Sequence, residues 1–180
     1  MKDTGIVRRV DVLGRVVIPR EIRKILNIND GDPLEIYTSA DEIILKKYSA
    51  VERKDFVAAD VAESLNKVTA HTAIICDRDV ILAASGAGAK ELTAKTVSKK
   101  LGKFMSENKS MVVNVSDGVQ PFEISEGNDH GFCNQFFLPI TDEQGVIGGV
   151  LLADKNKDAI ITSLDISLCK LSAEILSARR

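Results

Sequence analysis

The chain is poor in the residue types that build metal, disulfide and membrane sites. Its 180 residues include three cysteines, two histidines and no tryptophan, and aromatic residues make up 4%. Cys76, Cys133 and Cys169 are far apart and form no CxxC pair, so we expect three buried thiols rather than a disulfide framework or a zinc site. No apolar run approaches the roughly 18 residues of a membrane helix, and the first residues lack the apolar segment of a signal peptide. These absences predict a cytoplasmic protein without membrane contact.

Residue patterns suited to catalysis are equally scarce. His71 and His130 lack ligand spacing, and we expect the first to be a polar residue after a helix and the second a solvated loop residue. Residues 85–88, Ser-Gly-Ala-Gly, precede a helical pattern but lack the lysine and spacing of a phosphate-binding P-loop. The sequence therefore predicts no enzyme, no catalytic residue, no metal and no cofactor.

Positive charge is concentrated at one end of the chain. Residues 1–24 hold seven basic and three acidic residues, a net of +4, whereas residues 25–50 hold two and five, a net of −3. The remaining 130 residues hold 15 basic and 18 acidic residues, again a net of −3. Five of the first seven cations are arginine, whose planar guanidinium matches phosphate and guanine. The alternative, a solvated charged face, stays open at this point.

The local pattern around these arginines predicts a strand, a turn, a strand and a short helix. Residues 5–10 and 15–18 have strand-like composition on either side of a turn at 11–14. Pro19 suits the first turn of a helix over 20–26, because its missing N–H is not needed there. Arginines on both strands and on the helix could converge on one surface, which favours a nucleic-acid partner.

Four runs carry a resemblance to a known family. They are Thr-Gly-Ile-Val-Arg-Arg-Val-Asp, Leu-Gly-Arg-Val-Val-Ile-Pro, Leu-Glu-Ile-Tyr and Ile-Ile-Leu-Lys-Lys-Tyr, which begin at positions 4, 13, 34 and 43. Together they resemble the AbrB-type, swapped-hairpin DNA-binding domain over residues 1–50. The resemblance implies an interleaved homodimer whose arginines contact double-stranded DNA. The candidate DNA-binding residues are Arg8, Arg15 and Arg23, which match the family's positions, Lys24, which stands where the family often has another arginine, and the additional cations Arg9 and Arg20. Lysine at that position keeps the charge but loses the bidentate geometry of arginine.

The size of this first region also indicates a partner. Below about 70–80 residues a core usually needs a staple, a metal or a second chain. Residues 1–50 contain no cysteine and no histidine, so oligomerisation is what remains. We therefore expect residues 1–50 to form a homodimer, whose two-fold symmetry would suit duplex DNA.

Residues 51–180 are predicted to form a second domain. The pattern indicates an α+β fold, with an antiparallel sheet and flanking helices. It resembles a GAF domain, a small-molecule sensory module, most clearly in the apolar strand over 146–153 and the helix after it. The expected helices cover 51–68, 89–108 and 163–178, and the expected strands cover 72–76, 80–84, 111–115, 132–140 and 146–153.

Two features of this domain suggest partners. Residues 116–131 are expected to be irregular, and in a GAF-like fold they would lie near a ligand pocket. Its candidate lining residues are Phe122, Phe132, Phe136 and Phe137; that they are ordinary core residues is the alternative. The helix over 163–178 begins at a capping box formed by Thr162 and Asp165 and has two apolar stripes. One stripe can cover the sheet, and the other needs a second partner, either the helix over 51–68 or another subunit. We favour another subunit, which would build a homotetramer from N-terminal dimers.

The whole chain resembles transcription regulators of spore-forming bacteria. The resemblance implies control of sporulation-stage genes, as activator, repressor or both, with a C-terminal domain that oligomerises and senses a small effector. The alternative is an antitoxin-like DNA-binding protein whose C-terminal region binds a protein partner. A folded second domain of 130 residues argues against that alternative, because antitoxin tails are usually short.

Overall fold

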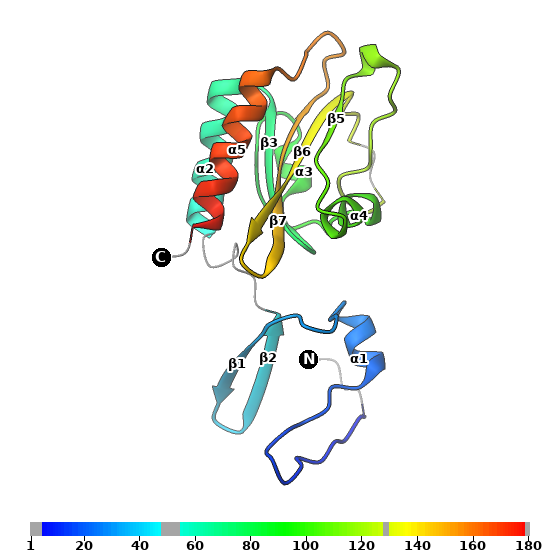
Figure 1. The fold of residues 1–180 in the computed structure, drawn as a ribbon, viewed down its shortest axis with the longest axis vertical. Coiled ribbons are helices and arrows are strands. Elements are labelled where there is room, and N and C mark those ends of the chain that lie inside the picture. Colours follow the sequence, from blue (N-terminus) through cyan, green and yellow to red (C-terminus); the bar gives the residue numbers. More distant parts are fainter. Residues whose placement is uncertain (1–4, 48–54, 128–129, 179–180) are drawn as a thin grey trace. The chain divides into compact units, whose positions relative to one another are not determined.

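The chain divides into two compact units. The computed structural model describes residues 5–47, 55–127 and 130–178. Unit 1 comprises Met1–Tyr48 and unit 2 comprises Ser49–Arg180 (Figure 1). The predicted helix at 51–68 begins outside the described residues, and its described part is Asp55–Thr69.

Unit 1 contains one short helix and one regular hairpin. Helix α1 spans Arg20–Ile25, directly after Pro19, as its sequence predicts. Strands β1, Leu34–Ser39, and β2, Glu42–Lys47, pair antiparallel across a two-residue turn. The sequence pattern also predicts strands over 33–39 and 43–48 on either side of a turn at 40–42. The structure confirms the helix and this hairpin.

The first predicted hairpin is different, because its strands are absent from this single chain. Residues 5–10 and 15–18 form no strand, although the turn between them is well defined. The Asp11 amide donates to the Arg15 carbonyl at 3.0 Å, and the Gly14 amide donates to the Asp11 carbonyl at 3.0 Å. Gly14 has a φ of +78°, the left-handed region that glycine adopts without strain. The prediction of two strands is therefore wrong for one chain, because a strand needs a ladder of partners.

Unit 2 is built on a five-stranded antiparallel sheet in the order β4-β3-β7-β6-β5. The apolar strand predicted over 146–153 forms β7, which lies at the centre of the sheet with both of its faces covered. The strands are β3 Thr72–Asp77, β4 Ile81–Ser85, β5 Met111–Val113, β6 Asn134–Asp142 and β7 Gly145–Asp154.

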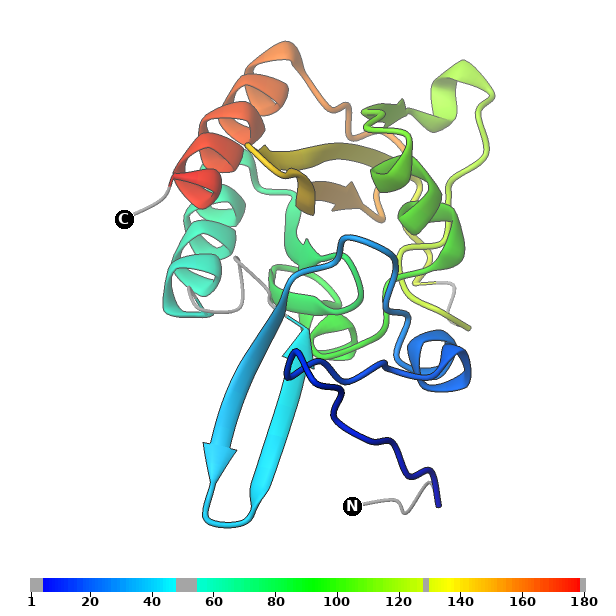
Figure 2. The same ribbon diagram turned by 60° about the horizontal axis from the view of Figure 1, so that its bottom comes forward.

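Helices cover both faces of this sheet (Figures 1 and 2). Helices α2, Asp55–Thr69, and α5, Ser163–Ser177, pack on one face with Ile75 of β3. Helices α3, Ala89–Leu92, and α4, Lys99–Ser106, pack on the other face with Ile74. Successive residues of β3 thus enter two separate cores, as the two-residue period of a strand requires.

The single helix predicted over 89–108 is wrong, because the chain forms α3 and α4 with a break between them. Ala94 has a φ of +64°, and Val97 pairs with Ser125 in an isolated bridge. The hydroxyl of Ser98 then caps α4 by accepting from the Leu101 amide at 3.1 Å. The β-branched residues before this cap favour extended backbone over helix. A 3-10 helix, η2, at Val115–Asp117 is the one regular element that interrupts the predicted irregular segment among its described residues.

The capping box of α5 is confirmed. The Asp165 amide donates to the Thr162 hydroxyl at 3.3 Å, and the Thr162 amide donates to the Asp165 carboxylate at 2.7 Å. This reciprocal pair satisfies two donors that a helix start otherwise leaves without partners.

Candidate nucleic-acid interface and ligand cavity

The six candidate DNA-binding residues all lie in the first 24 residues of unit 1. Five of them are exposed to solvent, and Arg23 is half-buried. Three come from α1, and their spacing of three and four residues makes Arg20 a neighbour of Arg23 and Lys24 on the helix surface. The others lie in the segment before α1, namely Arg8, Arg9 and Arg15.

Two of these arginines form ion pairs with carboxylates of the same unit. The Nε atom of Arg15 donates to Oδ2 of Asp11 at 2.7 Å. The Nη1 atom of Arg23 donates to Oδ1 of Asp30 at 2.5 Å. The backbone amide and side chain of Arg15 together lower the pKa of Asp11, so this carboxylate stays charged at neutral pH.

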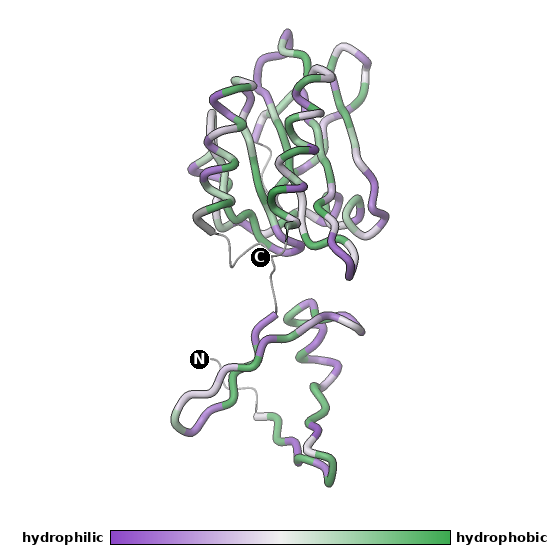
Figure 3. Tube along the Cα trace, turned by 60° about the vertical axis from the view of Figure 1, so that its left-hand side comes forward, coloured by the Kyte–Doolittle hydropathy of each residue, from purple (hydrophilic) through white to green (hydrophobic). Residues whose placement is uncertain are grey.

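Unit 1 has no buried residue among those the structure describes. Several large apolar side chains are more than half exposed instead, and hydrophobic stretches run along the open trace of this unit (Figure 3). This group comprises Val7, Val10, Val12, Leu13, Val16, Val17, Ile25, Leu26, Ile36 and Ile43. So much apolar surface on so small a unit is typical of a surface that another chain covers.

Unit 2 contains a cavity of about 460 Å³ beside the segment after η2. Two of the four predicted aromatic residues, Phe122 and Phe132, line this cavity. Phe137 belongs to the core on the same face of the sheet, and Phe136 belongs to the core on the opposite face. The fold thus separates neighbours in the sequence, because adjacent residues of a strand point to opposite faces.

The polar residues of the cavity were not found from the sequence. The Gln135 amide exchanges two hydrogen bonds with the backbone of Phe122, at 2.8 and 2.9 Å, and so fixes the cavity wall. His130 is buried, with Nε2 2.7 Å from the Ser125 hydroxyl, so the prediction of a solvated loop residue is wrong. A local pattern rich in Gly and Asn gives no sign of this burial, because it depends on packing of His130 against Ser125 and Phe132.

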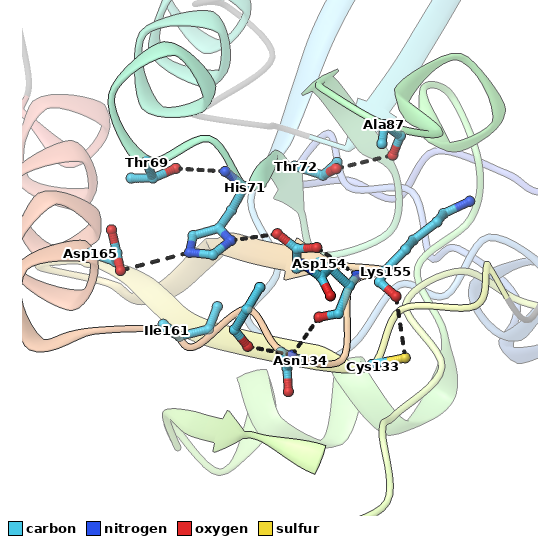
Figure 4. A network of polar contacts seen from close by, with 12 residues as sticks. Thr69, His71, Thr72, Ala87, Cys133, Asn134, Asp154, Lys155, Ile161 and Asp165 are labelled. Atoms are coloured by element: carbon cyan, nitrogen blue, oxygen red, sulfur yellow. Dashed lines mark hydrogen bonds and ion pairs between the residues drawn. The ribbon is translucent and has the colours of Figure 1, made fainter. Parts of the chain in front are cut away.

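His71 is the centre of a polar network at one end of the sheet (Figure 4). Its Nδ1 atom lies 2.8 Å from Oδ2 of Asp154, and its Nε2 atom lies 3.7 Å from Oδ2 of Asp165. The Nδ2 group of Asn134 donates nearby to the Asn156 carbonyl at 2.9 Å. Because these residues come from the end of α2 and from β6, β7 and α5, the network ties four elements together. His71 does follow a helix, as predicted, but it is a buried connector.

The three thiols differ in their surroundings. Cys76 and Cys169 are buried, whereas Cys133 is partly exposed, so the prediction of three buried thiols is wrong for one of them. Burial raises the pKa of Cys169 to about 12, with the nearby Asp165 carboxylate acting in the same direction. Burial likewise raises the pKa of Cys76 far above its usual range. In the described part of the chain, no group of residues could hold a metal ion and no helix could cross a membrane.

Two family models match the chain, one over each unit. The model described as "Stage V sporulation protein T C-terminal, transcription factor" matches residues 54–179. The model described as "Antidote-toxin recognition MazE, bacterial antitoxin" matches residues 7–53. The two matches meet between residues 53 and 54, five residues after the boundary between the units.

Individual proteins give a consistent result. The chain is 40% identical over 158 residues to "Stage V sporulation protein T" of Bacillus subtilis (strain 168), covering 87% of each chain. It is 65% identical over 48 residues to "Transition state regulatory protein AbrB" of the same organism, covering 27% of this chain and 50% of that protein. Unit 2 is similar to the crystal structure of the GAF domain from an Acinetobacter phosphoenolpyruvate-protein phosphotransferase. That match has 11% identity and a TM-score of 0.55, covers 71% of this chain and 86% of that one, and so shows the fold alone.

Proposed function

Because the chain belongs to the stage V sporulation protein T family, we propose that it regulates transcription during sporulation by binding DNA. The observation that carries this proposal is the family match over 87% of the chain, joined to a net charge of +4 in the first 24 residues. A regulator of this kind acts on the chromosome, in the bacterial cytoplasm. Its effect on a gene is activation, repression or both, according to where it binds.

The DNA-binding surface of this proposal is the basic part of unit 1. Arg8, Arg15, Arg23 and Lys24 carry the main contacts, with Arg9 and Arg20 as further cations. Contacts to phosphate release counterions, so the affinity falls steeply as the salt concentration rises. Arginine also reads guanine through two parallel hydrogen bonds, whereas Lys24 offers only a point charge.

Unit 1 acts as a homodimer in this proposal. Its exposed valines, leucines and isoleucines need a cover, and a second copy offers the same apolar surface in return. Pairing with a second chain would also let residues 5–10 and 15–18 form strands, which they do not form within one chain. The predicted hairpin then forms between chains, which reconciles the sequence pattern with the structure.

Unit 2 joins two such dimers into a tetramer. The outward face of α5 exposes Leu164 and Leu171 by 65% and 59%, and Ile175 by 48%. The neighbouring helix α2 exposes Val68 by 67%. Two adjacent helices with outward apolar stripes favour a helical bundle between subunits.

The cavity of unit 2 is proposed to hold a small effector. Its volume of about 460 Å³ lies within the usual range for small-molecule sites, roughly 300–1,000 Å³. Phe122 and Phe132 offer apolar contact, and Gln135 and His130 place polar groups beside them. Binding shifts DNA affinity if the effector prefers one arrangement of the tetramer.

An antitoxin-like function is the alternative that one observation favours, namely the match of residues 7–53 to an antitoxin family model. That match ends at residue 53 and leaves nearly all of unit 2 uncovered. Unit 2 has its own sheet and two cores, which is more than a toxin-binding segment needs. DNA regulation by an assembled protein therefore explains more of the chain.

DNA binding across a salt series tests the proposal. The wild type should bind duplex DNA with a steep negative slope of log affinity against log salt. Arg15→Ala should flatten that slope by about one unit for each phosphate that the Arg15 side chain neutralises, with the solution mass unchanged. Lys170→Ala, on α5 of unit 2, is the matched control and should leave the slope as it is. A wild type that binds no duplex at low salt would refute the proposal.

A further inference from the structure

We propose that Asp11 and Asp30 act on DNA binding in opposite directions, although each is an acidic residue paired with an arginine. Asp11 is a positioning residue that presents Arg15 to DNA, and Asp30 competes with DNA for Arg23. The inference rests on the proposed DNA-binding function. It deepens that function by assigning roles to two residues that no basic pattern would select.

Asp11 organises the turn that carries Arg15. Its Oδ1 atom accepts from the amides of Leu13 and Arg15, both at 2.9 Å. Its Oδ2 atom accepts from Nε of Arg15 at 2.7 Å. One carboxylate therefore fixes both the backbone and the guanidinium of the same arginine.

The choice of the Nε atom matters for recognition. An arginine that pairs through Nε keeps both terminal nitrogens, Nη1 and Nη2, for another partner. Those two atoms form the fork that grips a phosphate or the O6 and N7 atoms of guanine. Arg15 is well exposed, at 71% of its side chain, so the fork can reach a partner in solvent. Holding an exposed arginine in one orientation beforehand lowers the entropy lost on binding.

Asp30 does not position Arg23 in this way, because it contacts a terminal nitrogen of the guanidinium rather than Nε. It accepts from Nη1 of Arg23 at 2.5 Å, and Nη1 is one arm of the fork. The Nε atom of Arg23 is buried and makes no hydrogen bond in the described part of the chain, so no carboxylate orients this guanidinium from behind. The Asp30 side chain is 96% exposed and has room to move away. DNA must therefore displace Asp30 before it can use both arms of Arg23.

Asp11→Asn and Asp30→Asn form a matched pair of variants. Each removes one negative charge from unit 1 and changes little in size. In Asp11→Asn the amide oxygen can still accept from both backbone amides, so the turn is kept. The new NH₂ group faces the N–H of Arg15 Nε, and two donors cannot form the hydrogen bond.

The test measures two affinities for each full-length variant. One duplex is selected by the wild-type protein from a random pool, and the other is a random-sequence duplex of equal length. Asp11→Asn should weaken binding to the selected duplex by about ten-fold, the effect of losing a hydrogen bond to a charged group. Its binding to the random duplex should stay equal or strengthen. Asp30→Asn should strengthen binding to the selected duplex by about two- to five-fold, as expected from the loss of an exposed ion pair.

Simple electrostatics gives the competing outcome. If charge alone matters, each variant loses the same electrostatic repulsion from the DNA phosphates. Both variants then bind both duplexes more tightly than the wild type, by the same factor. That result would overturn the inference while leaving the proposed function intact. A wild type that selects no duplex would instead refute the proposed function.

A second pair of variants tests whether Asp11 acts by positioning the Arg15 guanidinium or only by stabilising the turn. In an Arg15→Ala protein there is no guanidinium to position, so adding Asp11→Asn should not weaken selected binding further. Sedimentation mass and thermal unfolding should match those of the parent protein. An equal ten-fold loss in the Arg15→Ala protein would show that Asp11 acts only through the turn, and would overturn its assignment.

Discussion

The two units of this chain solve the problem of burying apolar surface in opposite ways. Every buried hydrophobic residue among those the structure describes lies in unit 2, where a sheet is covered on both faces. Unit 1 has none, and ten of its valines, leucines and isoleucines are more than half exposed. Both units have regular elements and apolar residues in comparable patterns. A local pattern of apolar residues therefore does not tell whether a core is completed within one chain.

Separating the two units should give the largest effect. Residues 51–180 should unfold in one cooperative transition at a temperature that does not depend on protein concentration. Residues 1–50 should fold only as a dimer, so their unfolding temperature should rise with concentration. Thermal unfolding over a hundred-fold range of concentration, with sedimentation alongside, measures both. A folded monomer of residues 1–50 would contradict the claim that unit 1 needs a second chain to complete its core.

A core substitution in the central strand tests how much the buried sheet of unit 2 contributes to stability. Leu151, on β7, is fully buried in the core that α3 and α4 cover. Leu151→Ala should therefore cost about 2–5 kcal/mol of unfolding free energy. Val112→Ala, on the edge strand and 40% exposed, is the control and should cost clearly less. Denaturant unfolding of residues 51–180 measures both values. Equal costs would mean that the sheet is not the main source of stability.

The outward face of α5 is where unit 2 resembles unit 1, because it too leaves apolar residues exposed. Leu171→Glu should abolish the tetramer, since a charge in an apolar helical interface is costly to bury. The protein should then have the mass of a dimer, with its helix content and unfolding temperature little changed. Lys170→Glu lies beside it on the same helix and should keep the tetramer. A dimeric wild type would remove the basis of this prediction.

The smallest expected effect is on the reactivity of the three cysteine thiols, all of which lie in unit 2. Their raised pKa values keep Cys76 and Cys169 protonated at pH 8, because a thiol ionises only as the pH rises through its pKa. The thiolate is the reactive form, so one thiol per native chain should react with a disulfide reagent, and Cys133→Ser should remove that reaction. Three should react in denaturant. More than one fast-reacting thiol in the native protein would show that the core of unit 2 opens readily.

The sequence predicted much of the fold because the relevant signals are local. The β7 run, the capping box of Thr162 and Asp165, and the hairpin of β1 and β2 each depend on a few adjacent residues. The long helix over 89–108 failed because its break depends on distant partners. Val97 pairs with Ser125, and the Ile81 amide donates to the Lys95 carbonyl at 2.9 Å. Such pairings overrule a continuous helical pattern.

The candidate sites divide in the same way. The charged residues of unit 1 are visible in the sequence, because a cluster of arginine needs no fold to be recognised. Their carboxylate partners are less visible: Asp11 lies four residues from Arg15, but Asp30 lies seven residues from Arg23. Neither spacing by itself tells which guanidinium nitrogen is contacted. In unit 2 the sequence grouped four phenylalanines, of which only two line the cavity.

By itself, then, the sequence determined the family, the two regions, the end of the chain that carries positive charge, and most of the strands and helices. It did so because charge and short-range periodicity are properties of neighbouring residues. Only the tertiary structure decided which side chains share a face, that His71 joins Asp154 to the start of α5, and that no described residue of unit 1 is buried within one chain. These facts depend on contacts between residues far apart in the chain, such as His71 and Asp154, which lie 83 positions apart. No local pattern encodes that separation.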